Sequence, residues 1–182
     1  MTVQKEGVQV KQIIIYKSRT GFTKRYAKWL ADSLKCECIS IEEASRIGLS
    51  DYDVIIFGSS FRAGTIEEIK WYKEKVLPFG KINVVFVTGA MSPTSPEVVK
   101  SLEQNFTRQE RREIRTFYLQ SGLNYEAMNL KDKLMMKMFR SMLKSKKTKT
   151  EEERAFADLV QKSFDYSDPA NMEPMLNYLQ GL

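Results

Sequence analysis

Short apolar runs alternate with amphipathic stretches along this chain. The runs IIIY, VIIF and VVFV are continuous and rich in β-branched residues, as expected for central strands of a parallel sheet covered on both faces. The run near residue 38 alternates more and is expected nearer an edge. The pattern predicts five strands, at Gln12–Tyr16, Cys36–Ile41, Asp53–Gly58, Asn83–Thr88 and Arg115–Gln120.

Helix-start signals fill the gaps between these strands. Thr65 and Glu68 have the spacing of a capping box, and the same spacing recurs at Thr107 and Glu110. Ser95 precedes a proline, which suits an N-cap followed by the first helical position. The alternation of strands and helices predicts an α/β fold with an open, doubly wound, five-stranded parallel sheet and right-handed crossovers.

One amphipathic stretch has no place in a minimal five-stranded fold. The segment NLKDKLMMKMFRSMLKSKKTK carries Leu130, Leu134, Met138 and Met142 four residues apart, with lysines on the opposite face. This pattern predicts an extra basic helix after strand five. We expect one domain over residues 1–182, with a basic helical insertion at 130–149 and a C-terminal docking segment at 165–182.

The excess of positive over negative charge in the chain is confined to this segment. Lys131–Lys149 holds eight Lys or Arg and one acidic residue, so it has a net charge of +7, against +6 for the whole chain. Several interpretations stay open: contact with anionic lipid, contact with an acidic partner, or a helix packed on the domain with a solvated lysine face. Porphyrin carboxylates or a polar dimer partner would also be attracted by this charge. A nucleic-acid site is disfavoured, because the segment lacks interleaved aromatic residues and a known motif.

The remaining composition limits location and chemistry. No apolar run approaches the ~20 residues of a membrane span, and the first residues lack the apolar segment of a secretory signal, so we expect a cytoplasmic protein. The chain has no histidine, which removes Ser-His-Asp and Cys-His nucleophiles and histidine metal sites. Cys36 and Cys38 point the same way from one strand and are expected to be reduced thiols, with no metal site.

A hydroxyl-rich turn follows the first strand. Its sequence is SRTGFT, in which Ser18, Thr20 and Thr23 surround Gly21. One hydroxyl suffices to cap a helix, and ligands of open α/β sheets bind beyond the carboxyl ends of the strands, where a helix N-terminus attracts phosphate. The dinucleotide and P-loop glycine patterns are absent. The turn therefore predicts a phosphate site. The alternative is a helix N-cap that has more hydroxyl side chains than a cap requires.

This turn resembles the flavodoxin fingerprint Ser/Thr-x-Thr-Gly-x-Thr, whose hydroxyls and amides hold the terminal phosphate of FMN. GSSFRAG after the third strand and TGAMSP after the fourth occupy the positions where flavodoxins wrap the isoalloxazine ring. The resemblance implies a flavodoxin-like fold, FMN as the cofactor, and the following cofactor-binding residues: Ser18, Arg19, Thr20, Gly21, Phe22, Thr23, Ser59, Ser60, Phe61, Arg62, Ala63, Gly64, Gly89, Ala90, Met91 and Ser92.

The region after strand five, FYLQSGLNYEAMNLKDKLMMKMF, is similar to the flavodoxin-domain subfamily that includes menaquinone-dependent protoporphyrinogen oxidase. That resemblance implies an FMN-dependent oxidoreductase that transfers electrons between a reduced substrate and a quinone-type acceptor, with a quinone, a porphyrin-type substrate or a redox protein as partner. A non-enzymatic flavodoxin that carries electrons between proteins is the alternative. A fold that has lost FMN and serves as a binding module is a third interpretation.

The aromatic residues depart from the flavodoxin pattern. Flavodoxins usually sandwich the flavin between aromatics of the third- and fourth-strand loops; here Phe61 could be one, but the fourth loop has none. Tyr125 is a candidate substitute, whereas Trp71 is expected to pack in the core. An uncovered flavin face would leave room for a substrate. The flavin would do the chemistry, and Arg62 either stabilises reduced flavin or an acidic substrate or is a solvated arginine.

Overall fold

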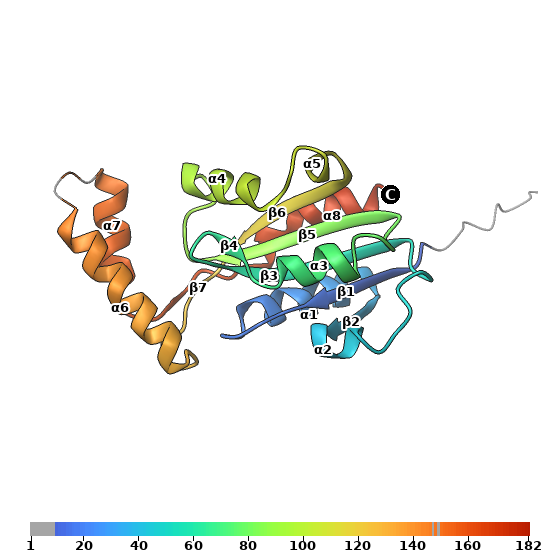
Figure 1. Ribbon diagram of the computed structural model, residues 1–182, viewed down its shortest axis with the longest axis horizontal. Coiled ribbons are helices and arrows are strands. Elements are labelled where there is room, and N and C mark those ends of the chain that lie inside the picture. Colours follow the sequence, from blue (N-terminus) through green and yellow to red (C-terminus); the bar gives the residue numbers. More distant parts are fainter. Residues whose placement is uncertain (1–9, 147, 149) are drawn as a thin grey trace, which may run out of the picture.

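The computed structural model describes residues 10–146, 148 and 150–182 (Figure 1). Lys147 and Lys149, which belong to the predicted basic segment, lie outside the described residues. The elements are β1 (Gln12–Tyr16), α1 (Phe22–Leu34), β2 (Glu37–Ser40), α2 (Ile41–Ala44), β3 (Val54–Arg62), β4 (Thr65–Ile66), α3 (Ile69–Lys75), β5 (Ile82–Gly89), α4 (Pro96–Asn105), α5 (Glu110–Glu113), β6 (Ile114–Gln120), β7 (Gly122–Leu123), α6 (Leu130–Ser145), α7 (Glu151–Leu159), β8 (Phe164–Asp165), η1 (Pro169–Met172) and α8 (Glu173–Gln180).

Five parallel strands form the main sheet in the order β2-β1-β3-β5-β6. The chain moves from β1 to one side and then to the other, so the order reverses between β1 and β3. This is the flavodoxin-like, doubly wound arrangement, and it confirms the fold class expected from the sequence. β1, β3 and β5 are central and β2 lies at an edge, as their apolar patterns indicated.

The two faces of the sheet are covered by different helices. Alternate residues of each central strand point to opposite faces: Ile14 packs with α1 and α8, whereas Ile13 and Ile15 pack with α3. Tyr26 of α1 and Tyr72 of α3 are fully buried against these faces. Helices on both faces of a parallel sheet account for the continuous apolar runs in the sequence.

One helix start differs from the expectation. Thr65 does not cap a helix: Thr65 and Ile66 form β4, which pairs antiparallel with Phe61 and Arg62 at the end of β3. Ala63 and Gly64, both with positive φ (50° and 80°), make the turn. Helix α3 therefore begins only at Ile69, with Glu68 as its N-cap. Strand pairing across this turn removes Thr65 from the position that the capping-box spacing indicated.

The helix start at Ser95 is confirmed, and the bonds expected at Thr107 form, although α5 begins only at Glu110 with Gln109 as its N-cap. Glu110 N–H donates to Thr107 Oγ1 (3.2 Å) and Thr107 N–H donates to Glu110 Oε2 (2.7 Å), the reciprocal bonds of a capping box. Ser95 is the N-cap of α4, with proline in the first turn. Cys36 and Cys38 are free thiols in the described part of the chain, and burial raises the pKa of each to about 11.

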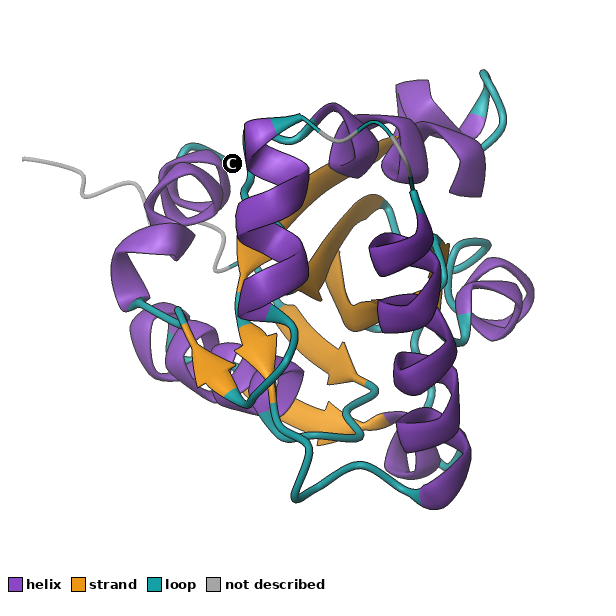
Figure 2. Ribbon diagram, turned by 90° about the vertical axis from the view of Figure 1, so that its left-hand side faces the viewer, coloured by secondary structure: helices purple, strands orange, loops and turns teal. Residues whose placement is uncertain are grey.

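The extra helix lies at one end of the molecule. The parallel strands run with their carboxyl ends toward α6 and α7 (Figure 1), and Figure 2, which looks onto that end, shows these two helices in front of the strands. The short antiparallel pair β7–β8 carries the chain out to the helix pair and back. Met175 and Leu179 of α8, in the C-terminal segment, are buried with α1 against the sheet.

Candidate functional site

A cavity of about 400 Å³ lies between the carboxyl ends of the strands and the α6–α7 helix pair. Three loops that are far apart in the sequence meet there, following β1, β3 and β5. The expected site residues that line it are Arg19, Thr20, Phe22, Thr23, Ser60, Phe61, Arg62, Ala63, Gly64, Gly89, Ala90 and Met91. Ser18, Gly21, Ser59 and Ser92 belong to the same loops but are not part of the lining as described.

The turn after β1 leaves the start of α1 without a side-chain cap. Gly21 is the N-cap, with φ of 98°, a left-handed conformation that glycine adopts without a steric penalty. No side chain among the described residues caps this helix. The hydroxyls of Ser18, Thr20 and Thr23 therefore do not serve as an N-cap of α1. The first N–H groups of α1 remain available to a ligand.

The hydroxyl of Ser18 is the clearest sign of a missing partner. Ser18 Oγ is buried and has no hydrogen-bond partner within the described chain. Thr23 is different, because its Oγ1 lies 2.8 Å from Thr88 Oγ1 in a buried contact. A buried hydroxyl without a partner costs free energy, so an anion that accepted its hydrogen bond beside the N-terminus of α1 would fit this turn.

The β3–β4 hairpin forms the second wall. Ser59 is fully buried and its hydroxyl donates to the carbonyl of Glu67 (2.7 Å), which fixes the base of the hairpin. Asn105 of α4 donates to the carbonyl of Gly64 (2.8 Å) and accepts from the amide of Ile66 (2.9 Å). These bonds tie the segment expected to contact the flavin ring to its own base and to α4.

Tyr118 of β6 is a lining residue that the sequence did not single out. Its ring stacks with that of Phe61, with centroids 6.2 Å apart and planes at 29°, and its hydroxyl donates to the carbonyl of Met91 (2.9 Å). Burial raises its pKa. A Cβ on Gly89 would lie 2.7 Å from the Tyr118 hydroxyl, so this glycine allows the loop after β5 to approach the tyrosine.

The other two aromatic candidates lie elsewhere. The hydroxyl of Tyr125 donates to the carbonyl of Val160 (2.6 Å), and Arg140 lies 5.6 Å from its ring centroid. Tyr125 thus ties the loop after β7 to α7 and is not part of the cavity lining as described. Trp71 packs against the core, 6.3 Å from Phe57 between ring centroids, which confirms its packing role.

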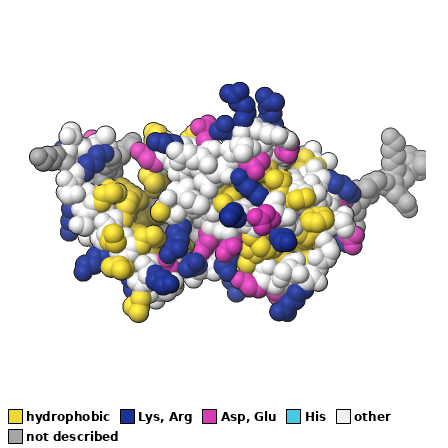
Figure 3. Space-filling view, viewed as in Figure 1, with side chains coloured by type: hydrophobic (Ala, Val, Ile, Leu, Met, Phe, Trp, Pro, Cys, Tyr) yellow, Lys and Arg dark blue, Asp and Glu magenta, His cyan; other side chains and the backbone are white. Residues whose placement is uncertain are grey.

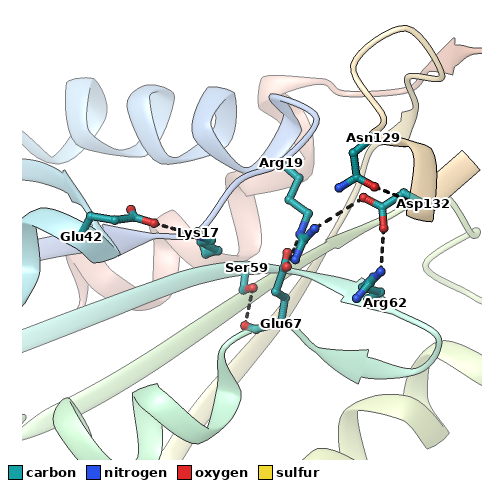
Figure 4. A network of polar contacts seen from close by, with 8 residues as sticks. All are labelled: Lys17, Arg19, Glu42, Ser59, Arg62, Glu67, Asn129 and Asp132. Carbon is teal, nitrogen blue, oxygen red and sulfur yellow. Dashed lines mark hydrogen bonds and ion pairs between the residues drawn. The ribbon is translucent and has the colours of Figure 1, made fainter.

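An ion-pair network joins α6 to two of the loops (Figure 4). Arg62 Nη2 donates to Asp132 Oδ1 (2.8 Å), and Arg19 Nη1 lies 3.6 Å from Asp132 Oδ2. Arg19 Nε also donates to Glu67, which raises the pKa of the guanidinium. Asp132 lies in the first turn of α6 and is only 7% exposed. Each of its carboxylate oxygens faces one arginine, and these two ion pairs anchor α6 to the loops. Arg62 is paired with this carboxylate and is not a freely solvated side chain.

Helix α6 also supplies the apolar half of the cavity. The cavity lining includes a methionine-rich set from α6, α7 and the nearby loops: Leu123, Met128, Met135, Met136, Phe139, Phe156 and Val160. Phe139 of α6 meets Phe156 of α7 edge to face, with centroids 6.4 Å apart. The sequence showed α6 as an apolar, basic helix, but it did not indicate that Met135, Met136 and Phe139 would face the site.

The described residues show neither a metal site nor a membrane-spanning helix. No group of three or more His, Cys, Asp or Glu side chains there could hold a metal ion. No helix of that part of the chain is long and apolar enough to cross a membrane.

Comparison with known proteins gives a family and a number of distant structural neighbours. A family model for the flavodoxin domain matches residues 13–151. The structure of a Trp repressor binding protein from Bacillus subtilis is 12% identical, with a TM-score of 0.45, over 60% of this chain and 84% of that one. A flavodoxin from the domain Archaea is 16% identical, with a TM-score of 0.39, over 83% and 96%. These two scores add nothing to the fold assignment. A search of curated proteins finds no match.

Proposed function

Because this chain belongs to the flavodoxin domain family, which indicates a flavin-binding redox domain, we propose that its cofactor is FMN. The observation that carries this proposal is the turn after β1, where the buried Ser18 hydroxyl lacks a partner beside the uncapped N-terminus of α1. A terminal phosphate would accept from both. FMN is proposed rather than FAD because the turn suits a monophosphate and nothing after β2 resembles an adenosine site.

The residues divide into two groups in this proposal. Ser18, Thr20 and the amides from Gly21 to Thr23 would hold the phosphate. Main-chain groups in 59–64 and 89–92 would contact the ring beside Phe61, and Arg62 would face its edge as a fixed positive charge. Bound FMN would supply reversible two-electron chemistry, while the protein binds the ring and excludes water from it.

For the reaction, we propose a two-electron oxidoreductase with a quinone-type acceptor. The apolar, methionine-rich half of the cavity supports this, because a pure electron carrier needs no pocket beside the flavin, whereas a flat apolar acceptor does. The acceptor would take up two electrons and two protons to become a quinol. The resemblance to the protoporphyrinogen oxidase-like subfamily points to the same class.

Cofactor identity and the role of Ser18 can be tested together. Chromatography of heat-released cofactor should yield FMN; recovery of FAD would refute the proposal. Ser18→Ala should weaken FMN binding by about 1–3 kcal/mol, yet leave the apoprotein as stable or slightly more stable, because a buried hydroxyl without a partner is removed. Ser33→Ala is the matched control, since Ser33 is exposed near the other end of α1, where its hydroxyl donates to the carbonyl of Trp29. If both variants bind FMN equally well, Ser18 does not hold the phosphate.

Reoxidation separates the enzyme from the electron carrier. The reduced holoprotein should be reoxidised by menaquinone analogues in stopped-flow experiments faster than free reduced FMN is. Reoxidation no faster than that of free FMN, together with rapid exchange with a redox protein, would favour the carrier.

A further inference from the structure

Helix α6 has two apolar faces, and only one of them is covered. Met135, Met136 and Phe139 line the cavity, and Asp132 is buried beside them. On the other side, Leu130, Leu134, Met138 and Met142 form an apolar stripe, with exposures of 85%, 60%, 66% and 60%. A helix packed on a domain needs one apolar face, so the exposed stripe requires another explanation.

The shape of the stripe suits a flat surface. Its four residues recur at every fourth position along one face, over about 18 Å of helix. The helix lies at the extreme end of the molecule, away from the sheet (Figure 1). Figure 3 shows hydrophobic side chains gathered over α6. The stripe is therefore at the surface over its whole length.

Lysines border the stripe, as dark blue side chains do around the hydrophobic patch in Figure 3. Helical spacing puts Lys133 and Lys137 along one border and Lys131 near the other, and all three are exposed. The lysines are therefore beside the stripe and not on the opposite face, where the sequence pattern was expected to place them; that face packs toward the cavity. The acidic residue of the helix, Asp132, is turned inward to Arg62 and Arg19. The outward face of α6 thus carries apolar, lysine and serine side chains, and the one acidic residue of the helix is turned away from it.

We propose that this face of α6 docks onto an anionic lipid surface. The apolar stripe would enter the boundary between headgroups and acyl chains, while the lysines remain at the level of the anionic headgroups. A second copy of the chain is a poorer occupant, because it would bring like-charged lysines together around the stripe. Acidic proteins could pair with the lysines, but a row of four unpaired apolar side chains suits lipid better.

Docking on lipid does not depend on the quinone-type acceptor proposed above. If both proposals hold, the protein would meet its acceptor at the membrane. The cavity wall and the stripe are opposite faces of one helix about 10 Å thick. A docked protein would hold the α6 wall of its cavity next to the bilayer, where lipid-soluble quinones reside. Failure of docking would leave the cofactor and acceptor proposals intact, and failure of those proposals would leave docking intact.

The test is co-sedimentation of the full-length protein with vesicles of phosphatidylcholine containing about 30% phosphatidylglycerol, compared with pure phosphatidylcholine. Binding should occur to the anionic vesicles and fall as salt rises from about 0.1 M to about 0.5 M. The double variant Leu134→Gln/Met138→Gln should weaken binding at least about 10-fold. Its matched control is Val99→Gln, which changes an exposed apolar residue on α4 (54% exposed) and should bind as wild type does.

The charge test has its own control. Lys133→Gln/Lys137→Gln should weaken binding about 30-fold at low salt, whereas Lys70→Gln/Lys100→Gln removes the same charge from exposed positions on α3 and α4 and should have little effect. Equal thermal unfolding midpoints would verify that all variants are folded. Any of four results would overturn the proposal. The first two are absence of binding and equal binding to neutral vesicles. The other two are binding that is lost with the lysines but unchanged by the apolar variant, and a dimer in sedimentation velocity that Leu134→Gln/Met138→Gln abolishes.

Discussion

In β1, Ile13, Ile14 and Ile15 are all fully buried, whereas in α6 the residues of the apolar stripe are 60–85% exposed. The sheet has helices on both faces, so each apolar side chain is covered whichever way it points. Helix α6 is covered on its cavity face only. The comparison separates apolar residues that stabilise the fold from apolar residues that are available for binding.

The two regions should differ most in their effect on stability. Ile56→Ala in β3 removes a fully buried side chain and should lower the free energy of unfolding by about 2–5 kcal/mol, because it leaves a cavity in the core. Leu134→Ala in α6 should change it by less than about 0.5 kcal/mol. Urea denaturation followed by circular dichroism measures both. A comparable loss at Leu134 would mean that the stripe is packed.

Oxidation sharpens the same comparison without mutation. Met138 and Met142 of α6 are 66% and 60% exposed, whereas Met172 and Met175 before and in α8 are 2% and 0% exposed. With dilute peroxide, the α6 sulfurs should react about 100-fold faster or more, because a buried sulfur must wait for an opening that costs several kcal/mol. Peptide mass spectrometry over time gives the rates. Similar rates at all four methionines would contradict the arrangement.

Asp132 joins α6 to the sheet domain through its ion pairs with Arg62 and Arg19. Asp132→Asn removes the charge that pairs with Arg62 and Arg19, so α6 should open more readily and its amide protons should exchange about 10-fold faster. The amides of the central strands should be unaffected. Glu103→Gln is the control, since its ion pair with Arg111 is long (4.0 Å) and exposed. If exchange in α6 did not change, the network would not anchor the helix.

Neighbouring methionines on α6 should have separate effects. Met136→Gln alters the cavity face and should slow reoxidation by a menaquinone analogue about 5-fold, because a polar group replaces an apolar contact. Met138→Gln alters the stripe and should leave reoxidation in detergent-free solution unchanged. Stopped-flow kinetics on the two holoproteins compares them directly. Equal effects would mean that the two faces of α6 are not distinct.

The sequence predicted the sheet well because burial on both faces leaves a continuous apolar run in each central strand. The bounds of β1 agree with the expectation, and the three loops expected to bind the cofactor do meet at one cavity. The extension of β3 to Arg62 was missed because Ala63 and Gly64 form a turn without a strong sequence signal, and the spacing of Thr65 to Glu68 favoured a helix.

The site was less predictable where distant segments contribute to it. Tyr118, Glu67 and Asp132 reach the cavity or its network through tertiary contacts, and none belongs to a motif. A hydroxyl-rich turn such as SRTGFT, directly after a strand, carries its own signal, whereas a buried acidic residue inside a lysine-rich helix resembles ordinary helix charge. Asp132 could have been suspected as the one acidic residue in a basic segment. The face of α6 that Met135 and Met136 occupy is decided by that anchor.

The central claim is that the turn after β1 holds a phosphate. Fluorescence titration of the apoprotein with FMN, riboflavin and FAD tests it most directly, because riboflavin has the same ring without the phosphate. FMN should bind at least about 100-fold more tightly than riboflavin, given several hydrogen bonds to a charged group worth about 1.5–3 kcal/mol each, and more tightly than FAD. Equal affinities for riboflavin and FMN, or no binding of either, would contradict it.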